Sequence, residues 1–135
     1  MPQGASITIN ALHGISDSLD ATGASSSTGI GYDSGNCGNI TINNGTVNAT
    51  GVGYGAGIGG AYSDGSSVKI VINGGTVTAT GNLRSAGIGG RAGCPSGIIQ
   101  INNINNTKVY AYGGPGGPES AVEALAGPMS AGISL

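Results

Sequence analysis

Apolar residues alternate with polar or small residues in short segments that recur along the chain. In the first set, each segment reads isoleucine, one other residue, isoleucine, asparagine, and successive members are 33, 30 and 29 residues apart. The set comprises 7–10, 40–43, 70–73 and 99–102. Alternation with a period of two is typical of a β-strand that buries one face. The pattern therefore predicts one strand about every thirty residues.

Two further sets follow the first in each repeat. The second set ends in glycine and comprises 19–23, 47–51, 77–81 and 109–113. The third set carries Gly-Ile and comprises 28–31, 56–59, 86–89 and, after an insertion, 131–134. Three short strands cannot bury an inner face alone, so successive repeats must stack, each strand pairing in parallel with its counterpart one repeat later. The chain is thus predicted to be an all-β parallel solenoid of four coils with three strands per coil.

The repeat predicts one solenoid domain over residues 1–135, with coils at about 5–37, 38–67, 68–96 and 97–135. Stacked strands lie about 4.8 Å apart, so ladders of aliphatic side chains fill a narrow core. The inward residues expected in coil 1 are Ile7, Ile9, Leu19, Ala21 and Ile30, with their equivalents above them. The absence of Phe and Trp agrees with so narrow a core.

Glycine and asparagine mark the predicted corners. Glycine can take a positive φ without a Cβ clash, which suits Asn44-Gly45, Gly74-Gly75, Gly51, Gly81 and Gly59-Gly60 to the turns between strands. Asparagine recurs at one corner as Asn10, Asn43, Asn73 and Asn102. If these side chains point inward, each amide can bond to the coils above and below it, which predicts an asparagine ladder.

Coil 4 contains an insertion between its second and third strands. Residues 118–127 begin with proline and an acid, continue with helix formers and end in glycine, which predicts a short helix. We expect this helix to cover the last coil, because an open solenoid end is an unpaired edge. No such segment precedes coil 1, so its end is expected to meet other coils or another molecule.

Charge and composition narrow the range of partners. Charged residues make up 7% of the chain and the formal net charge is -2, so there is no basic patch for nucleic acid and no cationic face for a membrane. No segment has the length and hydropathy of a membrane span, and the N-terminus lacks the regions of a secretory signal. Nucleic-acid and membrane binding are therefore not expected.

The central repeats resemble a known kind of module. Residues 40–51 and 73–81, the latter reading Asn-Gly-Gly-Thr-Val-Thr-Ala-Thr-Gly, are each followed by Ala-Gly-Ile-Gly-Gly, at 56–60 and 86–90. These runs resemble the glycine-rich repeats of large secreted or cell-surface proteins of Gram-positive bacteria and of phage. The resemblance covers coils 2 and 3 best. It implies a right-handed parallel β-helix in an extracellular stalk, fibre, adhesin or phage appendage, and it carries no catalytic motif and no cofactor.

For each candidate catalytic or cofactor motif, a structural interpretation is stronger than a functional one. Residues 55–60 match the glycine pattern of dinucleotide sites, but that mechanism needs a helix directly after the glycines, and here the chain leads into another strand. His13, Asp17 and nearby serines lie in the coil 1 insertion, where a flexible corner lacks the rigid geometry of a catalytic triad. We expect no catalytic residue and no enzyme activity.

The two cysteines and the acids do not form an obvious site. Cys37 and Cys94 lie in comparable connections two coils apart, about 9.6 Å by stacking, which exceeds the usual disulfide range of about 4.4 to 6.8 Å. A bridge would require the loops to bend together. With one histidine, a zinc site lacks ligands. The six acids are scattered, so paired carboxylates are also missing.

The outward face of the second strand is the best candidate for a binding surface. In coils 2 and 3 it carries Thr46, Asn48, Thr50, Thr76, Thr78 and Thr80. A flat threonine array can match the ice lattice. However, coil 1 contributes Ser18, Asp20 and Thr22. The regular patch is therefore short, and the preference of threonine for exposed strands explains it more simply.

Tyr110 and Tyr112 extend this face in coil 4. Aromatic rings beside amides such as that of Asn48 suit stacking on sugars. The competing interpretation is that the coil 4 insertion folds over the rings and uses them as a docking site. The sequence thus favours an architectural repeat module that associates with copies of itself or with further repeats of a parent chain, with carbohydrate binding and ice binding as the alternatives.

Overall fold

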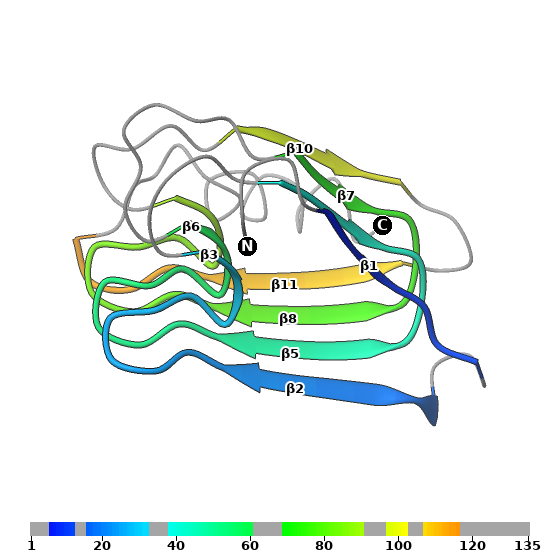
Figure 1. Cartoon of the computed structure of the whole chain (residues 1–135), viewed down its shortest axis with the longest axis horizontal. Helices are drawn as coiled ribbons and strands as arrows, with labels where there is room; N and C mark the ends of the chain where they lie inside the picture. The colour runs from blue at the N-terminus through cyan, green and yellow to red at the C-terminus, as the bar shows by residue number, and fades with distance from the viewer. Residues whose placement is uncertain are drawn as a thin grey trace.

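The computed structural model describes residues 6–12, 16–32, 38–60, 69–90, 97–102 and 107–116 of the 135-residue chain. The described residues contain eleven β-strands in three sheets, and every pair of neighbouring strands is parallel. Among the described residues, each of the first three turns of the chain adds one strand to each sheet, and the fourth adds a strand to two of them (Figure 1). The fold is a parallel β-helix, which confirms the predicted fold class.

Sheet A has the strand order β1-β4-β7-β10. Its strands are β1 (Ser6–Ile9), β4 (Asn39–Ile42), β7 (Lys69–Ile72) and β10 (Ile98–Ile101). Ile7 pairs with Ile40, Ile40 with Ile70 and Ile70 with Ile99, so the predicted register is confirmed. Each strand begins one residue before the repeated segment and ends before its asparagine.

Sheet B has the order β11-β8-β5-β2, and its strands form a stack of four arrows in Figure 1. They are β2 (Ser18–Thr22), β5 (Thr46–Thr50), β8 (Thr76–Thr80) and β11 (Lys108–Tyr112). The apolar members Leu19, Val47, Val77 and Val109 stand in one column. Along each strand, the residues that alternate with the apolar ones point their side chains away from the core. These outward side chains form the candidate site.

Sheet C contains β3 (Ile30–Tyr32), β6 (Ile58–Gly60) and β9 (Ile88–Gly89) in that order. The prediction that Gly59-Gly60 forms a corner is wrong, because both residues belong to β6. A Cβ at Gly59, whose φ is +136°, would lie 1.8 Å from the carbonyl oxygen of Gly89. Glycine is needed here because successive coils approach closely.

Several predictions lie outside the described residues. These are the third strand of coil 4 at 131–134, the helix at 118–127, His13 and the two cysteines Cys37 and Cys94.

The core is densest in the two central coils. Its fully buried side chains are Ile40, Ile42, Val47, Ile58, Ile70, Ile72, Val77 and Ile88. The terminal coils are more open. Ile7, Ile9, Ile99, Ile101 and Val109 are only partly buried. The prediction that Leu19 is a core residue is wrong for the described chain, since its side chain is 38% exposed; it has a coil on one side only.

The corners confirm part of the glycine prediction. Gly45 and Gly75 have φ values of +97° and +86°, as expected for the turn between sheets A and B. Gly51 and Gly81 do not have a positive φ. They are glycine because a Cβ would meet backbone oxygens, at 2.0 Å from Gly55 and 2.2 Å from Ala86. The close approach of another backbone segment, rather than the sign of φ, explains why these two positions are glycine.

The asparagine ladder is confirmed. The Nδ2 atoms of Asn43, Asn73 and Asn102 each donate to the Oδ1 atom of the asparagine one coil earlier, at 2.7 Å in all three cases. Their backbone N–H groups also donate to the previous coil, to Ile9, Ile42 and Ile72. The ladder lies at the corner, where its members are half-buried or exposed. Each asparagine therefore adds two bonds between coils.

Candidate functional site

The outer face of sheet B is a grid of twelve side chains in three columns. The register of the four strands places Ser18, Thr46, Thr76 and Lys108 in the first column, Asp20, Asn48, Thr78 and Tyr110 in the second, and Thr22, Thr50, Thr80 and Tyr112 in the third. All twelve side chains are half-buried or exposed. The structure thus brings together, on one flat face, all eight residues that the sequence singled out as a possible ligand surface.

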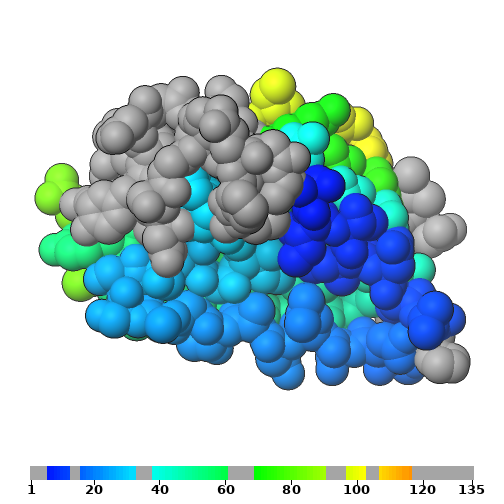
Figure 2. Space-filling view, in the orientation of Figure 1, coloured from blue at the N-terminus to red at the C-terminus, as the bar shows by residue number. Residues whose placement is uncertain are grey.

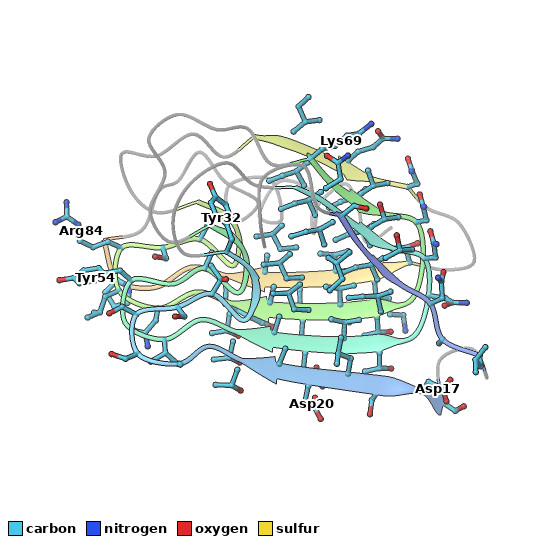
Figure 3. All side chains as sticks on the ribbon, in the orientation of Figure 1. Asp17, Asp20, Tyr32, Tyr54, Lys69 and Arg84 are labelled. Carbon is cyan, nitrogen blue, oxygen red and sulfur yellow. The ribbon has the colours of Figure 1, made fainter. Side chains whose placement is uncertain are left out.

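Coils 1 and 2 are tied together on this face. The Asn48 amide donates from Nδ2 to Oδ1 of Asp20 at 2.6 Å. In Figure 3 Asp20 projects from β2, away from the side chains that the sheets enclose. This charge-assisted bond occupies the middle column between the threonines on either side. The threonine array is therefore interrupted, and the ice-binding prediction gains no support from the geometry.

The two tyrosines dominate the coil 4 end of the face. Tyr110 is 46% exposed and Tyr112 is 54% exposed. They stand two residues apart on one strand, so their Cα atoms are separated by roughly 6.6 Å along it. Threonine hydroxyls of β8 lie directly beside them, Thr78 next to Tyr110 and Thr80 next to Tyr112. Two open rings with hydroxyl groups at their side can stack on a planar or ring-shaped ligand and donate or accept hydrogen bonds.

The other candidate motifs have structural roles where the structure describes them. Oδ2 of Asp17 accepts a bond from the backbone N–H of Leu12 at 2.8 Å, so this carboxylate closes the coil 1 insertion. The glycine pattern at 55–60 runs from a turn into β6, so its last three residues are extended strand, whereas the glycines of a dinucleotide site open a helix.

Metal-ligand clusters and membrane-spanning helices are both absent from the described residues. Within the described ranges there is no group of three or more His, Cys, Asp or Glu residues that could hold a metal ion. In the same part of the chain, no helix has the length and hydropathy needed to cross a membrane.

Three buried polar or aromatic residues were not anticipated from the sequence. Ser85 is fully buried and its Oγ donates to the carbonyl oxygen of Tyr54 at 2.6 Å. Thr107 is 1% exposed, and its Oγ1 donates to the carbonyl oxygen of Asn102 at 2.8 Å. Tyr32 is 5% exposed and lies against Gly60. Tyr32 and Thr107 continue the inward alternation of β3 and β11, but their hydroxyl groups gave no signal of burial in the sequence. Ser85 belongs to no alternating segment.

Comparison with known proteins gives one match. The family model for beta helix repeats matches residues 40–62 and 70–94, which span β4 to β9 except for the first residue of β4 and of β7. No curated protein and no solved structure matches the chain. The chain is therefore similar to beta helix repeats over its two central coils. The three parallel sheets of the described residues form a β-helix that includes these coils.

Proposed function

We propose that this chain is a non-catalytic, structural β-helix module of an extracellular or cell-surface protein. A fibre, a stalk, an adhesin or a phage appendage is the setting that its repeats favour, through their resemblance to surface-protein repeats. Its coils stack on further coils, supplied by copies of itself or by other repeats of a parent chain. The module acts as a rigid spacer that is extended through its ends.

The observation that carries this proposal is that the repeated side chains serve stacking between coils. Isoleucine columns fill the core, the asparagine ladder joins each described coil to the next, and the glycines of sheet C let the coils approach. A solenoid stabilised by neighbour contacts gains stability with every added coil. Repeats of this kind are therefore suited to elongated assemblies.

Mass measured against concentration tests the proposal. We expect the weight-average mass from light scattering to rise steadily above 12.8 kDa as the protein is concentrated. A mass that stays at the monomer value up to millimolar concentration would contradict the self-association part of the proposal.

Carbohydrate binding by the coil 4 end of sheet B is the second candidate. The exposure of Tyr110 and Tyr112 beside threonine hydroxyls favours it. A glycan array should show a ligand that the double variant Tyr110→Ala, Tyr112→Ala loses and that the control Thr22→Ala, at the other end of the face, retains. Loss of thermal stability in the double variant with unchanged glycan binding would assign the rings to packing instead.

A further inference from the structure

Both ends of the described β-helix carry strands that pair on one side only. β1 and β2 are the outermost strands of sheets A and B at one end, and β10 and β11 are outermost at the other. Edge strands present N–H and C=O groups that a further strand can pair with. Atoms of β1 and β2 lie on the surface seen in Figure 2. The coil 1 end and the coil 4 end are thus two templates for an additional coil.

The bonds at the asparagine corner all run in one direction. In the three described steps, the asparagine of a coil donates through its backbone N–H to the last isoleucine of the preceding strand of sheet A, at 2.7 to 2.9 Å. Its Nδ2 donates to the asparagine one coil earlier. Asn10 has no described coil before it, so its two donors have no acceptor among the described residues. At the other end, Oδ1 of Asn102 accepts from Nε2 of Gln100 at 3.2 Å and keeps one lone pair. Neither this oxygen nor the carbonyl oxygen of Ile101 has an asparagine donor after it among the described residues. The two ends are complementary.

We propose that the coil 4 end of one molecule stacks on the coil 1 end of a second copy. β10 pairs in parallel with β1 of the copy, and β11 pairs with β2, in the register seen between neighbouring coils. Ile101 then meets Ile9 of the copy, and Asn102 accepts from its Asn10, which continues both ladders. This inference rests on the proposed self-association and adds which surfaces meet and in which orientation.

Apolar exposure at both ends agrees with this junction. At the coil 1 end Ile7 and Ile9 are half-buried and Leu19 is 38% exposed. At the coil 4 end Ile99, Ile101 and Val109 are half-buried. The equivalent residues of the two central coils are buried because a coil lies on each side of them. Stacking a second copy would bury the terminal residues in the same way, and burial of apolar surface favours association.

Charge selects this orientation over its alternative. In the extended register Lys108 stands beside Ser18 of the copy, and Asp20 of the copy lies two residues further along the same face. Residues in this diagonal relation are close enough for long side chains to interact. A junction of coil 1 with coil 1 would instead bring the two Asp20 carboxylates to the same interface. Among the described charges of this face, opposite signs therefore meet when coil 4 stacks on coil 1 and not when coil 1 stacks on coil 1.

Thr8 offers a variant that blocks one end without removing a bond inside the molecule. Parallel strands pair through alternate residues, and Ile9 directs its carbonyl toward β4, where Asn43 donates to it at 2.9 Å. Thr8 consequently turns its N–H and C=O groups away from β4, and its side chain is exposed. Thr8→Pro deletes the outward donor, and proline is tolerated on an edge strand. Thr8→Val is the matched control, since it keeps the N–H group and the β-branched shape.

Sedimentation of the whole chain at rising concentration tests the junction. We expect the unchanged protein and Thr8→Val to associate alike, and Thr8→Pro to stay monomeric where the unchanged protein is more than half associated. Circular dichroism and thermal midpoints check that the variants fold. A second variant, Lys108→Glu, alters a side chain that is exposed and far from coil 1 in the same molecule. We expect it to weaken association about two- to fivefold, the range of an exposed ion pair.

Each other outcome counts against a definite part of the scheme. A monomeric unchanged protein overturns both the junction and the self-association on which it rests, including the case in which residues 117–135 occupy the coil 4 end. Association that survives Thr8→Pro overturns the junction alone. Association that Thr8→Pro abolishes and Lys108→Glu leaves unchanged overturns the proposed orientation, in which Lys108 lies near Asp20 of the copy.

Discussion

At the scale of single residues, the fold constrains two kinds of position most. These are the glycines of sheet C, which have no side chain, and the asparagines of the ladder. Gly31, Gly59 and Gly89 of sheet C stand in a column, in which Gly31 and Gly59 each lie under the backbone of the next coil. In the ladder, Asn43, Asn73 and Asn102 each donate to the asparagine one coil earlier, and the two in the middle also accept from the asparagine one coil later. Both types of position govern the spacing of coils, so substitutions there test the stacking directly.

We expect Gly59→Ala to destabilise the chain strongly. The new Cβ would lie 1.8 Å from the carbonyl oxygen of Gly89, and alanine strongly disfavours a φ of +136°. Backbone strain and overpacking together should cost about 3 kcal/mol or more in the free energy of unfolding. Gly60→Ala is the control, because its Cβ would be 3.2 Å from a ring atom of Tyr32 and its φ is not in the left-handed region. Equal costs in urea unfolding would contradict the close-approach explanation.

We expect Asn73→Ala to cost about 1 to 3 kcal/mol in the free energy of unfolding. The substitution removes a donor to Asn43 and leaves Asn102 without its acceptor, in a half-buried corner. Asn10→Ala removes one exposed bond, to Asn43, and should cost less than 1 kcal/mol. Denaturant melts of both variants provide the comparison, and a similar loss at both positions would mean that burial does not strengthen the ladder.

At the scale of elements, the strands could be predicted from the sequence better than their boundaries. Isoleucines about thirty residues apart gave the register of sheet A because insertions between coils lie in connections and leave the strands aligned. The boundary at Asn43 was missed by one residue, since its backbone N–H extends the ladder beyond β4. Gly59 and Gly60 were placed in a corner because glycines carry no alternation of apolar and polar residues.

The candidate site, too, could be predicted from the sequence only in part. The columns of sheet B follow from the register, so the neighbours of Tyr110 and Tyr112 could be anticipated. The bond between Asp20 and Asn48 could not, because side chains that share a face do not reveal their rotamers in the sequence. The exposure of Leu19 was also missed, since its pattern is that of a core residue and only its position in the outermost described coil leaves it open.

We expect the same deletion in sheet A to cost more in a central strand than in a terminal one. Ile72 of β7 is fully buried, whereas its counterpart Ile101 of β10 is half-buried. Truncating a buried isoleucine to alanine costs about 2 to 5 kcal/mol, and partial exposure reduces both the transfer and the cavity contributions. Ile72→Ala should therefore lower the free energy of unfolding at least about twice as much as Ile101→Ala. Urea unfolding of the two variants at low protein concentration measures the difference.

At the scale of the whole molecule, stability in a stacked array depends on how many neighbours a coil has. Coils 2 and 3 each contact a coil on both sides, whereas the described strands of coils 1 and 4 pair on one side. Local opening should therefore be easiest at the ends and rarest in the middle. Association through the ends would change this gradient, because it would turn terminal coils into internal ones.

Amide hydrogen exchange measured at two protein concentrations separates these states. In dilute solution we expect the Asn10 amide to exchange fast, since no described residue accepts from it, and the Asn43 amide to exchange slowly, because it donates to Ile9 at 2.9 Å. At a concentration where the mass shows association, the Asn10 amide should slow at least about tenfold while that of Asn43 changes little. Slowing confined to other surfaces would place the contact elsewhere. Protection of Asn10 in the dilute monomer would mean that the chain itself covers its coil 1 end.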